Sequence, residues 1–110
     1  MNGLTKKLRH IVMFGFKEGT TEAEAAEIAQ RFGALRDLVP GIDDFEWGEN
    51  NSQEGKSHGL THCFILTFVS AEARDAYLPH PDHQAFVSFA RQWIEKATVF
   101  DYWVADGDRS

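Results

Sequence analysis

The sequence predicts a single α+β domain built around an antiparallel sheet, and three observations support that prediction. The chain has 110 residues, the length of one ordinary domain, and 43% of them are hydrophobic, including nine Phe and three Trp. Segments that alternate with the period of a strand are interleaved with segments spaced like an amphipathic helix. Both faces of the predicted strands carry apolar residues, so both faces of the sheet should be covered.

The first strand and the first helix are marked by a change in hydrophobic period. Residues 8–16 alternate as a strand. The residues of one face are Leu8, His10, Val12, Phe14 and Phe16. Thr21 and Glu24 have the spacing of a capping box, which predicts the start of a helix. Apolar residues continue at helical spacing to Val39, and Pro40-Gly41 ends the helix.

Two more strands are predicted on either side of a loop. Residues 43–48 hold Phe45 and Trp47 in alternation, which indicates a short strand. Residues 49–59 are polar and contain glycine, so they predict an exposed hairpin loop. The clearest strand covers residues 60–69. One of its faces carries His62, Phe64, Leu66 and Phe68.

Two helices and a last strand complete the predicted domain. Ser70 is expected to cap a short helix over residues 71–78. A second helix is expected to begin at Pro81. Its apolar face would present Phe86, Phe89, Ala90, Trp93 and Ala97. A strand over residues 98–104 follows.

This order of elements is the split βαβ pattern of the ferredoxin-like fold, which has a four-stranded antiparallel sheet. The domain should cover residues 8–104, between an N-terminal tail (1–7) and a C-terminal tail (105–110). Its helices can cover only one face of the sheet. The other face is expected to expose Ile11, Met13, Cys63, Ile65, Val69, Val99 and Trp103. Such a patch predicts a homodimer, because a second copy packed sheet against sheet would close a dimeric α/β barrel.

Charge and composition exclude several classes of partner. The net charge is −6, and the 11 basic residues are scattered among 17 acidic ones, so we expect no nucleic-acid partner. No apolar run approaches the roughly 20 residues of a membrane span, so we expect no membrane partner. Cys63 is the single cysteine, which excludes an intrachain disulfide and fits a reducing compartment. With a polar N-terminus that lacks a cleavage signal, these features predict a cytoplasmic protein.

Chemistry is expected at the corner between the two predicted helices. Pro79 cannot continue a helix that arrives through Tyr77, whereas Pro81 suits the first position of a new helix. The corner should bring Tyr77 close to His83, whose ring the positive helix terminus keeps neutral. A neutral imidazole is a competent base near neutral pH. Two interpretations stay open at this point: a catalytic or binding pair, or a corner held by side-chain hydrogen bonds.

The same corner is also a candidate metal site. His80, Asp82 and His83 offer two or three ligands for a divalent ion. Pro81 places His80 outside the helix, so the two histidines do not share a face. We therefore expect no metal, and we expect His80 to cap the second helix.

Several short motifs follow one another along the chain. They are His10-Ile11-Val12, Trp47-Gly48, Gly59-Leu60-Thr61-His62, Tyr77-x-x-His80-Pro81-x-His83-x-x-Phe86 and Phe100-Asp101-Tyr102. Together they resemble the stress-responsive dimeric α/β-barrel (Dabb) family over residues 10–102. The resemblance implies the dimeric barrel independently. It also implies a reaction known in that family, the cofactor-free cyclisation of a linear polyketide thioester by intramolecular aldol condensation.

The resemblance further implies roles for individual residues. His83 would be the catalytic base and Tyr77 its partner, which donates a hydrogen bond to a developing enolate oxygen. The polar substrate-binding residues would be His10, His62 and Asp101. The apolar wall would be formed by Phe14, Phe32, Phe64, Phe86 and Phe89. The strands of His10 and His62 should run antiparallel, so these two histidines need not meet, although the resemblance favours both near the cavity.

The leading hypothesis is therefore a homodimer that binds a small apolar or polyketide-like molecule rich in carbonyl groups, and that cyclises or isomerises it without a cofactor. A non-enzymatic stress-responsive protein is the alternative. A cofactor-free or haem-degrading monooxygenase is a third possibility, because those enzymes share the dimeric barrel. They usually carry a Trp on the third strand, where this chain has Phe64, Leu66 and Phe68.

Overall fold

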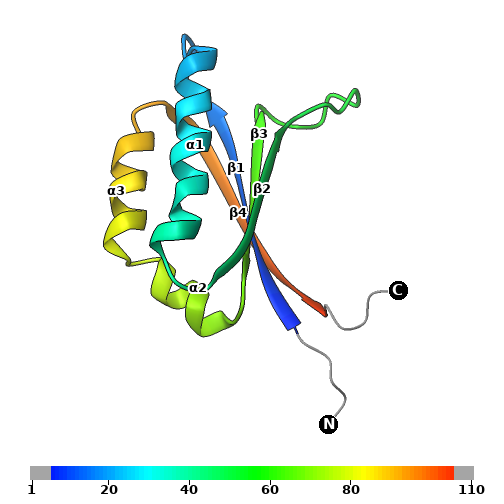
Figure 1. Cartoon of the computed structure of the whole chain (residues 1–110). Helices are drawn as coiled ribbons and strands as arrows, with labels where there is room; N and C mark the ends of the chain where they lie inside the picture. The colour runs from blue at the N-terminus through cyan, green and yellow to red at the C-terminus, as the bar shows by residue number, and fades with distance from the viewer. Residues whose placement is uncertain (1–5, 106–110) are drawn as a thin grey trace.

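The computed structural model describes residues 6–105 as a four-stranded antiparallel sheet with helices packed on one face (Figure 1). The elements are β1 (Lys6–Phe16), α1 (Glu22–Leu38), β2 (Ile42–Glu49), β3 (His62–Phe68), α2 (Ala71–Tyr77), α3 (Pro81–Ala90) and β4 (Ile94–Ala105). The strand order is β2-β3-β1-β4, which confirms the predicted ferredoxin-like fold. The predicted tails fall largely on residues 1–5 and 106–110, which lie outside the described part.

Helix α1 begins where the sequence predicts it. The Thr21 hydroxyl accepts a hydrogen bond from the Glu24 amide at 3.1 Å, and the Glu24 carboxylate accepts one from the Thr21 amide at 2.9 Å. The capping box is thereby confirmed, and it satisfies two amides that the helix cannot. The buried face of α1 consists of Ile28, Ala29, Phe32 and Leu35. This face packs over the sheet and forms one wall of the molecule's core.

The corner between α2 and α3 is also confirmed. The Ser70 side chain caps α2, which ends at Tyr77. Helix α3 starts at Pro81, with His80 as its N-cap residue. The His80 Nδ1 atom accepts a hydrogen bond from the Asp82 amide at 3.1 Å, as expected for a capping side chain.

The boundary between α3 and β4 differs from the prediction. Helix α3 ends at Ala90, and β4 begins at Ile94, so Trp93 and Ala97 are not helical. The helix ends early because the residues from Ile94 onward pair with β1, which is long enough to reach them. Ile94 lies opposite Phe16 across an irregularity in the β1–β4 pairing. The Trp93 carbonyl also accepts a hydrogen bond from the Lys17 amide at 2.7 Å.

The register of β4 corrects the predicted composition of the open sheet face. Val99 lies opposite Val12, and Trp103 lies opposite Leu8. Directly paired residues share a face, so both side chains point to the helical side, not to the open face as predicted. The open face instead carries Phe100 and Tyr102, which are exposed. Its other apolar side chains are Ile11, Met13, Cys63 and Ile65.

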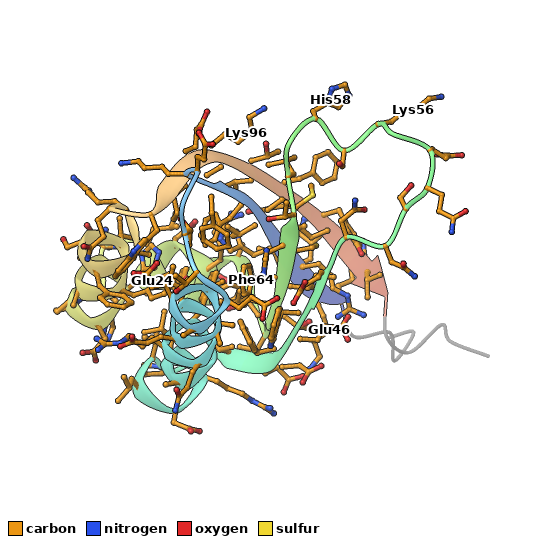
Figure 2. The ribbon with its side chains drawn as sticks, turned by 90° about the horizontal axis from the view of Figure 1, so that it is seen from above. Glu24, Glu46, Lys56, His58, Phe64 and Lys96 are labelled. Carbon is orange, nitrogen blue, oxygen red and sulfur yellow. The ribbon has the colours of Figure 1, made fainter. Side chains whose placement is uncertain are left out.

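Seen from above, the helices gather on one side of the sheet, and the polar loop between β2 and β3 extends away from them (Figure 2). Residues 50–61 of this loop are mostly exposed, as predicted. None of the helices within residues 6–105 has both the length and the apolar character needed to cross a membrane.

Candidate functional site

A cavity of about 400 Å³ lies between the helices and the helical side of β1 and β4. The predicted site residues His10, Phe14, Phe32, Tyr77, His83 and Phe86 all line it. Prolines 79 and 81 place Tyr77 and His83 there, because they end α2 and start α3 within a few residues. The structure therefore brings together most of the residues singled out from the sequence.

Tyr77 is the most informative residue of the cavity. Its side chain is 0% exposed, and its hydroxyl has no hydrogen-bond partner within the described part of the chain. Burial raises the pKa of Tyr77 far above its ordinary value, which keeps the phenol protonated. A buried polar group without a partner is rare in folded proteins, so this hydroxyl is a donor available to a ligand.

His83 is half-buried and packs against Tyr77 with the two rings tilted, 4.1 Å between the ring centroids. Its Nδ1 atom lies 2.9 Å from the Leu78 carbonyl oxygen. A carbonyl can only accept, so Nδ1 carries the hydrogen and the neutral ring keeps an unprotonated Nε2. Burial lowers the pKa of His83, the hydrogen bond to Leu78 opposes this, and the charges of His10 and His80 lower it further.

His10 belongs to the same site through β1 and is buried. Its Nδ1 atom lies 2.8 Å from one carboxylate oxygen of Asp101 on β4. The His10 ring also makes an edge contact with Tyr77, at 5.8 Å between centroids. Asp101 itself does not line the cavity, and it reaches the cavity only through the histidine.

Besides Asp101, three more of the predicted residues lie outside the cavity. His62 lies opposite Phe14 at the far end of β3, where its ring stacks on Trp47. Phe64 is fully buried behind the cavity wall, 4.9 Å from the ring centroid of Phe32. Phe89 is partly buried against the core but outside the cavity, and the Arg31 guanidinium lies 3.9 Å from its ring centroid.

Several lining residues were not identified from the sequence. They are Val12, Leu78, Val87, Ala90, Arg91, Ile94, Ala97 and Val99. The last three belong to β4, whose start and register no local pattern revealed. Leu78 and Val87 flank the predicted corner in sequence, and helical spacing around His83 was a usable signal for Val87.

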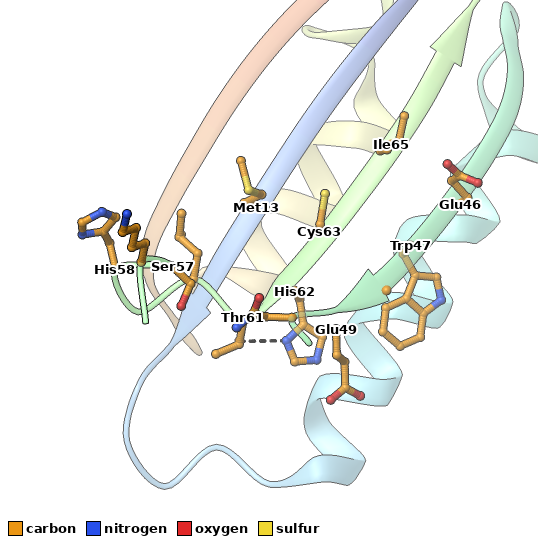
Figure 3. Close-up of a pocket in the computed structure, with 14 residues that line it drawn as sticks. Met13, Glu46, Trp47, Glu49, Ser57, His58, Thr61, His62, Cys63 and Ile65 are labelled. Carbon is orange, nitrogen blue, oxygen red and sulfur yellow. Dashed lines mark hydrogen bonds between the residues drawn. The ribbon is translucent and has the colours of Figure 1, made fainter. Parts of the chain in front are cut away.

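Two further hollows lie at the opposite end of the sheet. One, of about 560 Å³, is formed on the open face by Met13, Cys63 and Ile65 together with the β2–β3 loop (Figure 3). The other, of about 620 Å³, lies beside the first turn of α1 and Trp47. Both are larger than the Tyr77 cavity. In the described residues, however, neither contains a buried side-chain polar atom that lacks a partner.

No metal cluster is apparent within residues 6–105, where no group of three or more His, Cys, Asp or Glu side chains is placed to hold an ion. At the candidate corner site, the His80 Nδ1 atom is occupied by the Asp82 amide. Apart from Arg91, the titratable residues that line the cavity supply a phenol donor and imidazole rings, which suit proton transfer.

Comparisons with known proteins agree with this architecture. The chain is 34% identical over 95 residues to olivetolic acid cyclase of Cannabis sativa, covering 86% of this chain and 94% of the relative. It is 32% identical over 95 residues to the stress-response A/B barrel domain-containing protein HS1 of Arabidopsis thaliana, covering 86% and 87%. A solved dimeric ferredoxin-like protein of unknown function from Jannaschia is 27% identical, with a TM-score of 0.76, over 87% of this chain and 97% of that one.

A family model described as the stress responsive A/B barrel domain (Dabb) matches residues 8–104. The match covers nearly the whole chain, and both curated relatives exceed 30% identity over most of their length. The chain therefore belongs to the Dabb family.

Proposed function

We propose that the cavity binds a small carbonyl-rich molecule and that Tyr77 and His83 catalyse its cyclisation or isomerisation without a cofactor. The observation that carries the proposal is the buried Tyr77 hydroxyl, which has no partner in the described residues and lies in a cavity beside the His83 imidazole. The similarity to a relative named as a cyclase supports the reaction class.

The geometry suits acid–base chemistry on a poly-β-carbonyl compound. His83 Nε2 would remove the acidic proton between two carbonyl groups, which generates an enolate. The enolate carbon would attack a second carbonyl of the same molecule and form a carbon–carbon bond. Tyr77 would donate its hydrogen bond to the oxygen on which negative charge develops. The proton taken by His83 would then return to that oxygen, so the step needs no other reactant.

The pKa shifts favour these two roles near neutral pH. A lowered pKa keeps His83 unprotonated and able to accept a proton. A raised pKa keeps the Tyr77 phenol protonated and able to donate. The two environments thus move the pKa values of the base and the donor apart, which is the arrangement that proton-transfer sites require.

The cavity walls suggest a compact ligand. Phe32 stacks on Phe86 at 4.6 Å between centroids and packs near Phe14 at 6.1 Å. Aromatic rings packed this closely leave little room for a long flexible chain beyond the polar end. We propose a ligand whose carbonyl groups reach Tyr77 and whose apolar part is short.

A non-enzymatic role is the second candidate. It is favoured by the relative named only as a stress-response A/B barrel domain-containing protein. In that case the same cavity would sequester an apolar metabolite, and no product would form. Binding would depend on the Phe wall more than on His83.

We also propose a homodimer formed through the open sheet face, in the cytoplasm. The solved relative described as dimeric supports the dimer. The face offers Ile11, Ile65 and Phe100 as apolar contacts. The single unpaired Cys63 is consistent with the compartment.

Kinetics with synthetic tri- and tetra-β-keto thioesters test the proposal. We expect saturable formation of a cyclic product, and His83→Ala and Tyr77→Phe should reduce turnover at least about 100-fold. His62→Ala and Tyr102→Phe are matched controls outside the cavity, and they should keep most of the activity. Binding of the thioesters without turnover would favour the non-enzymatic role. Equal effects of the site and control variants would contradict the assignment.

A further inference from the structure

A chain of hydrogen bonds links three elements behind the cavity. Arg74 on α2 donates from Nη1 to Asp101 Oδ2 on β4 at 2.6 Å. The other carboxylate oxygen of Asp101 lies 2.8 Å from His10 Nδ1 on β1. Each oxygen of Asp101 therefore has its own partner, a guanidinium on one side and an imidazole on the other. Neither the family resemblance nor the sequence patterns had drawn attention to Arg74.

This arrangement determines how His10 meets the cavity. A carboxylate only accepts hydrogen bonds, so the His10 Nδ1 atom must carry the hydrogen. In the neutral form of the ring, the lone pair is then on Nε2. The ring's hydrogen bond within the described residues is made through Nδ1, which leaves Nε2 open, and His10 lines the cavity. A ligand would thus meet a second imidazole Nε2 besides that of His83.

Arg74 is the part of the chain that fixes the carboxylate. With His10 as its only partner, the Asp101 carboxylate would be free to rotate about its side-chain bonds. The charge-assisted bond from Arg74 holds the second oxygen and so removes that freedom. Asp75 in turn accepts from Arg74 Nε at 2.7 Å, which orients the guanidinium.

The same ion pair also places Tyr77. Arg74 and Tyr77 are three residues apart on α2, so they lie on adjoining parts of one helix face. Tying Arg74 to β4 therefore fixes the height of α2 over the sheet, where the Tyr77 and His10 rings meet. The pair is partly exposed, with about a quarter of each side chain accessible, so it adds little to stability by itself.

We infer that Arg74 is a positioning residue of the cavity: through Asp101 it holds His10 in one orientation and one tautomer, with Nε2 presented to the ligand. The part of the inference that concerns the ligand rests on the proposed function. The part that concerns the orientation and tautomer of His10 does not. In the proposed reaction, His10 Nε2 accepts a hydrogen bond from an enol or hydroxyl group of the bound molecule. Asp101 acts through His10, and Arg74 acts through Asp101.

The first test needs no ligand. A ¹⁵N–¹H correlation spectrum of the His10 ring in the wild-type protein should show a single tautomer with hydrogen on Nδ1. Arg74→Met should give a mixture of tautomers and faster exchange of the Nδ1 hydrogen with water. Arg36→Met is the matched control, because Arg36 binds the Asp43 carbonyl and Asp44 away from the cavity, and it should leave the His10 spectrum unchanged.

The second test uses the tri-β-keto thioester as the probe. Arg74→Met should weaken its binding about tenfold, the effect of losing one oriented hydrogen bond. Arg74→Lys should restore part of the affinity, because an ammonium can still donate to Asp101. A purely structural ion pair would lower the melting temperature in Arg74→Met without changing tautomer or affinity.

The outcomes separate this inference from the proposed function. A wild-type tautomer in Arg74→Met overturns the inference, whatever the activity. A changed tautomer with unchanged probe affinity overturns the role of His10 in binding. If the wild-type protein does not bind the probe at all, the proposed ligand class is wrong, and the His10 spectrum alone still supports or overturns the positioning by Arg74.

Discussion

Tyr77 combines complete burial with an unused hydroxyl, and this has a consequence for stability. Leaving a buried hydroxyl without a partner costs about 1–3 kcal/mol. Tyr77→Phe keeps the ring contacts with Phe68 and His83 and removes only that oxygen. We expect the unfolding free energy of the variant to equal that of the wild type or to exceed it by up to about 1 kcal/mol. The variant should nevertheless lose turnover.

Chemical denaturation of both proteins checks this expectation. A loss of stability in Tyr77→Phe would mean that the hydroxyl has a partner in the folded ligand-free protein, and the catalytic interpretation of its burial would fail. Tyr102→Phe is the matched control, since it removes the same hydroxyl from a residue outside the cavity.

His83 makes stability depend on pH in a direction that its environment fixes. Burial lowers its pKa from the ordinary 6.5, so the unfolded chain takes up the proton first as the pH falls. This contribution to stability is therefore complete above about pH 6.5 and decreases as the pH falls below it. Between pH 7.5 and 5.5 the wild type should lose more unfolding free energy than His83→Asn.

Unfolding curves at the two pH values measure that difference. His58→Asn is the control, because His58 lies on the exposed loop with a φ of 56° that asparagine tolerates well. A ring titration that places the pKa of His83 above 6.5 would contradict both the sign of this effect and the neutral base.

At the scale of single residues, the local sequence predicted the corner but not its support. Pro79 and Pro81 restrict the backbone wherever they occur, so they were sufficient to bring Tyr77 and His83 together. Arg74 binds a carboxylate 27 residues away on another element. That partnership depends on how α2 packs over the sheet, and no local pattern in the sequence indicates it.

Among the elements, the capped starts of helices were predictable because their signals are local. Thr21 with Glu24 and Ser70 each satisfy amides within three residues. The start of β4 could not be predicted in this way, because Trp93 and Ala97 also fit helical spacing. Pairing with the end of β1 decided that boundary, and pairing is a long-range contact.

The β2–β3 loop packs closely against the end of β1, where Gly59 lies beside Gly15, and this contact leads to a prediction for the two elements. A Cβ on Gly15 would lie 2.3 Å from the Gly59 carbonyl oxygen, a contact that only a backbone shift can relieve. Gly15→Ala should therefore destabilise the protein by about 1–3 kcal/mol. It should also speed hydrogen exchange of the Thr61 amide, which donates to the Phe14 carbonyl at 2.8 Å.

Gly48→Ala provides the matched control on β2, where nothing lies within 4 Å of the added carbon. It should leave stability unchanged or raise it slightly, because alanine restricts the unfolded chain. Equal unfolding free energies for the two variants would show that the loop does not pack against β1 as the structure has it.

For the whole molecule, the sequence predicted the layers and the open apolar face but misplaced two of its residues. Residues 99–103 of β4 are apolar or aromatic at every position except Asp101, so alternation cannot tell one face from the other. The register with β1 settles it and turns Phe100 outward in place of Val99.

The last prediction concerns the open face, where an introduced charge should prevent assembly of the dimer. Ile65 lies opposite Ile11 at the centre of that face, and Phe100 is paired with Ile11 on the other side. In the proposed dimer, Ile65→Lys would bury an ammonium without a partner, at a cost of several kcal/mol. Sedimentation equilibrium at micromolar concentration should show a dimer for the wild type and a monomer or unfolded chain for the variant. Leu38→Lys adds the same charge at an exposed site on α1 and should leave the dimer intact. A stable wild-type monomer, or an Ile65→Lys protein that still dimerises, would mean that another surface holds the two copies together.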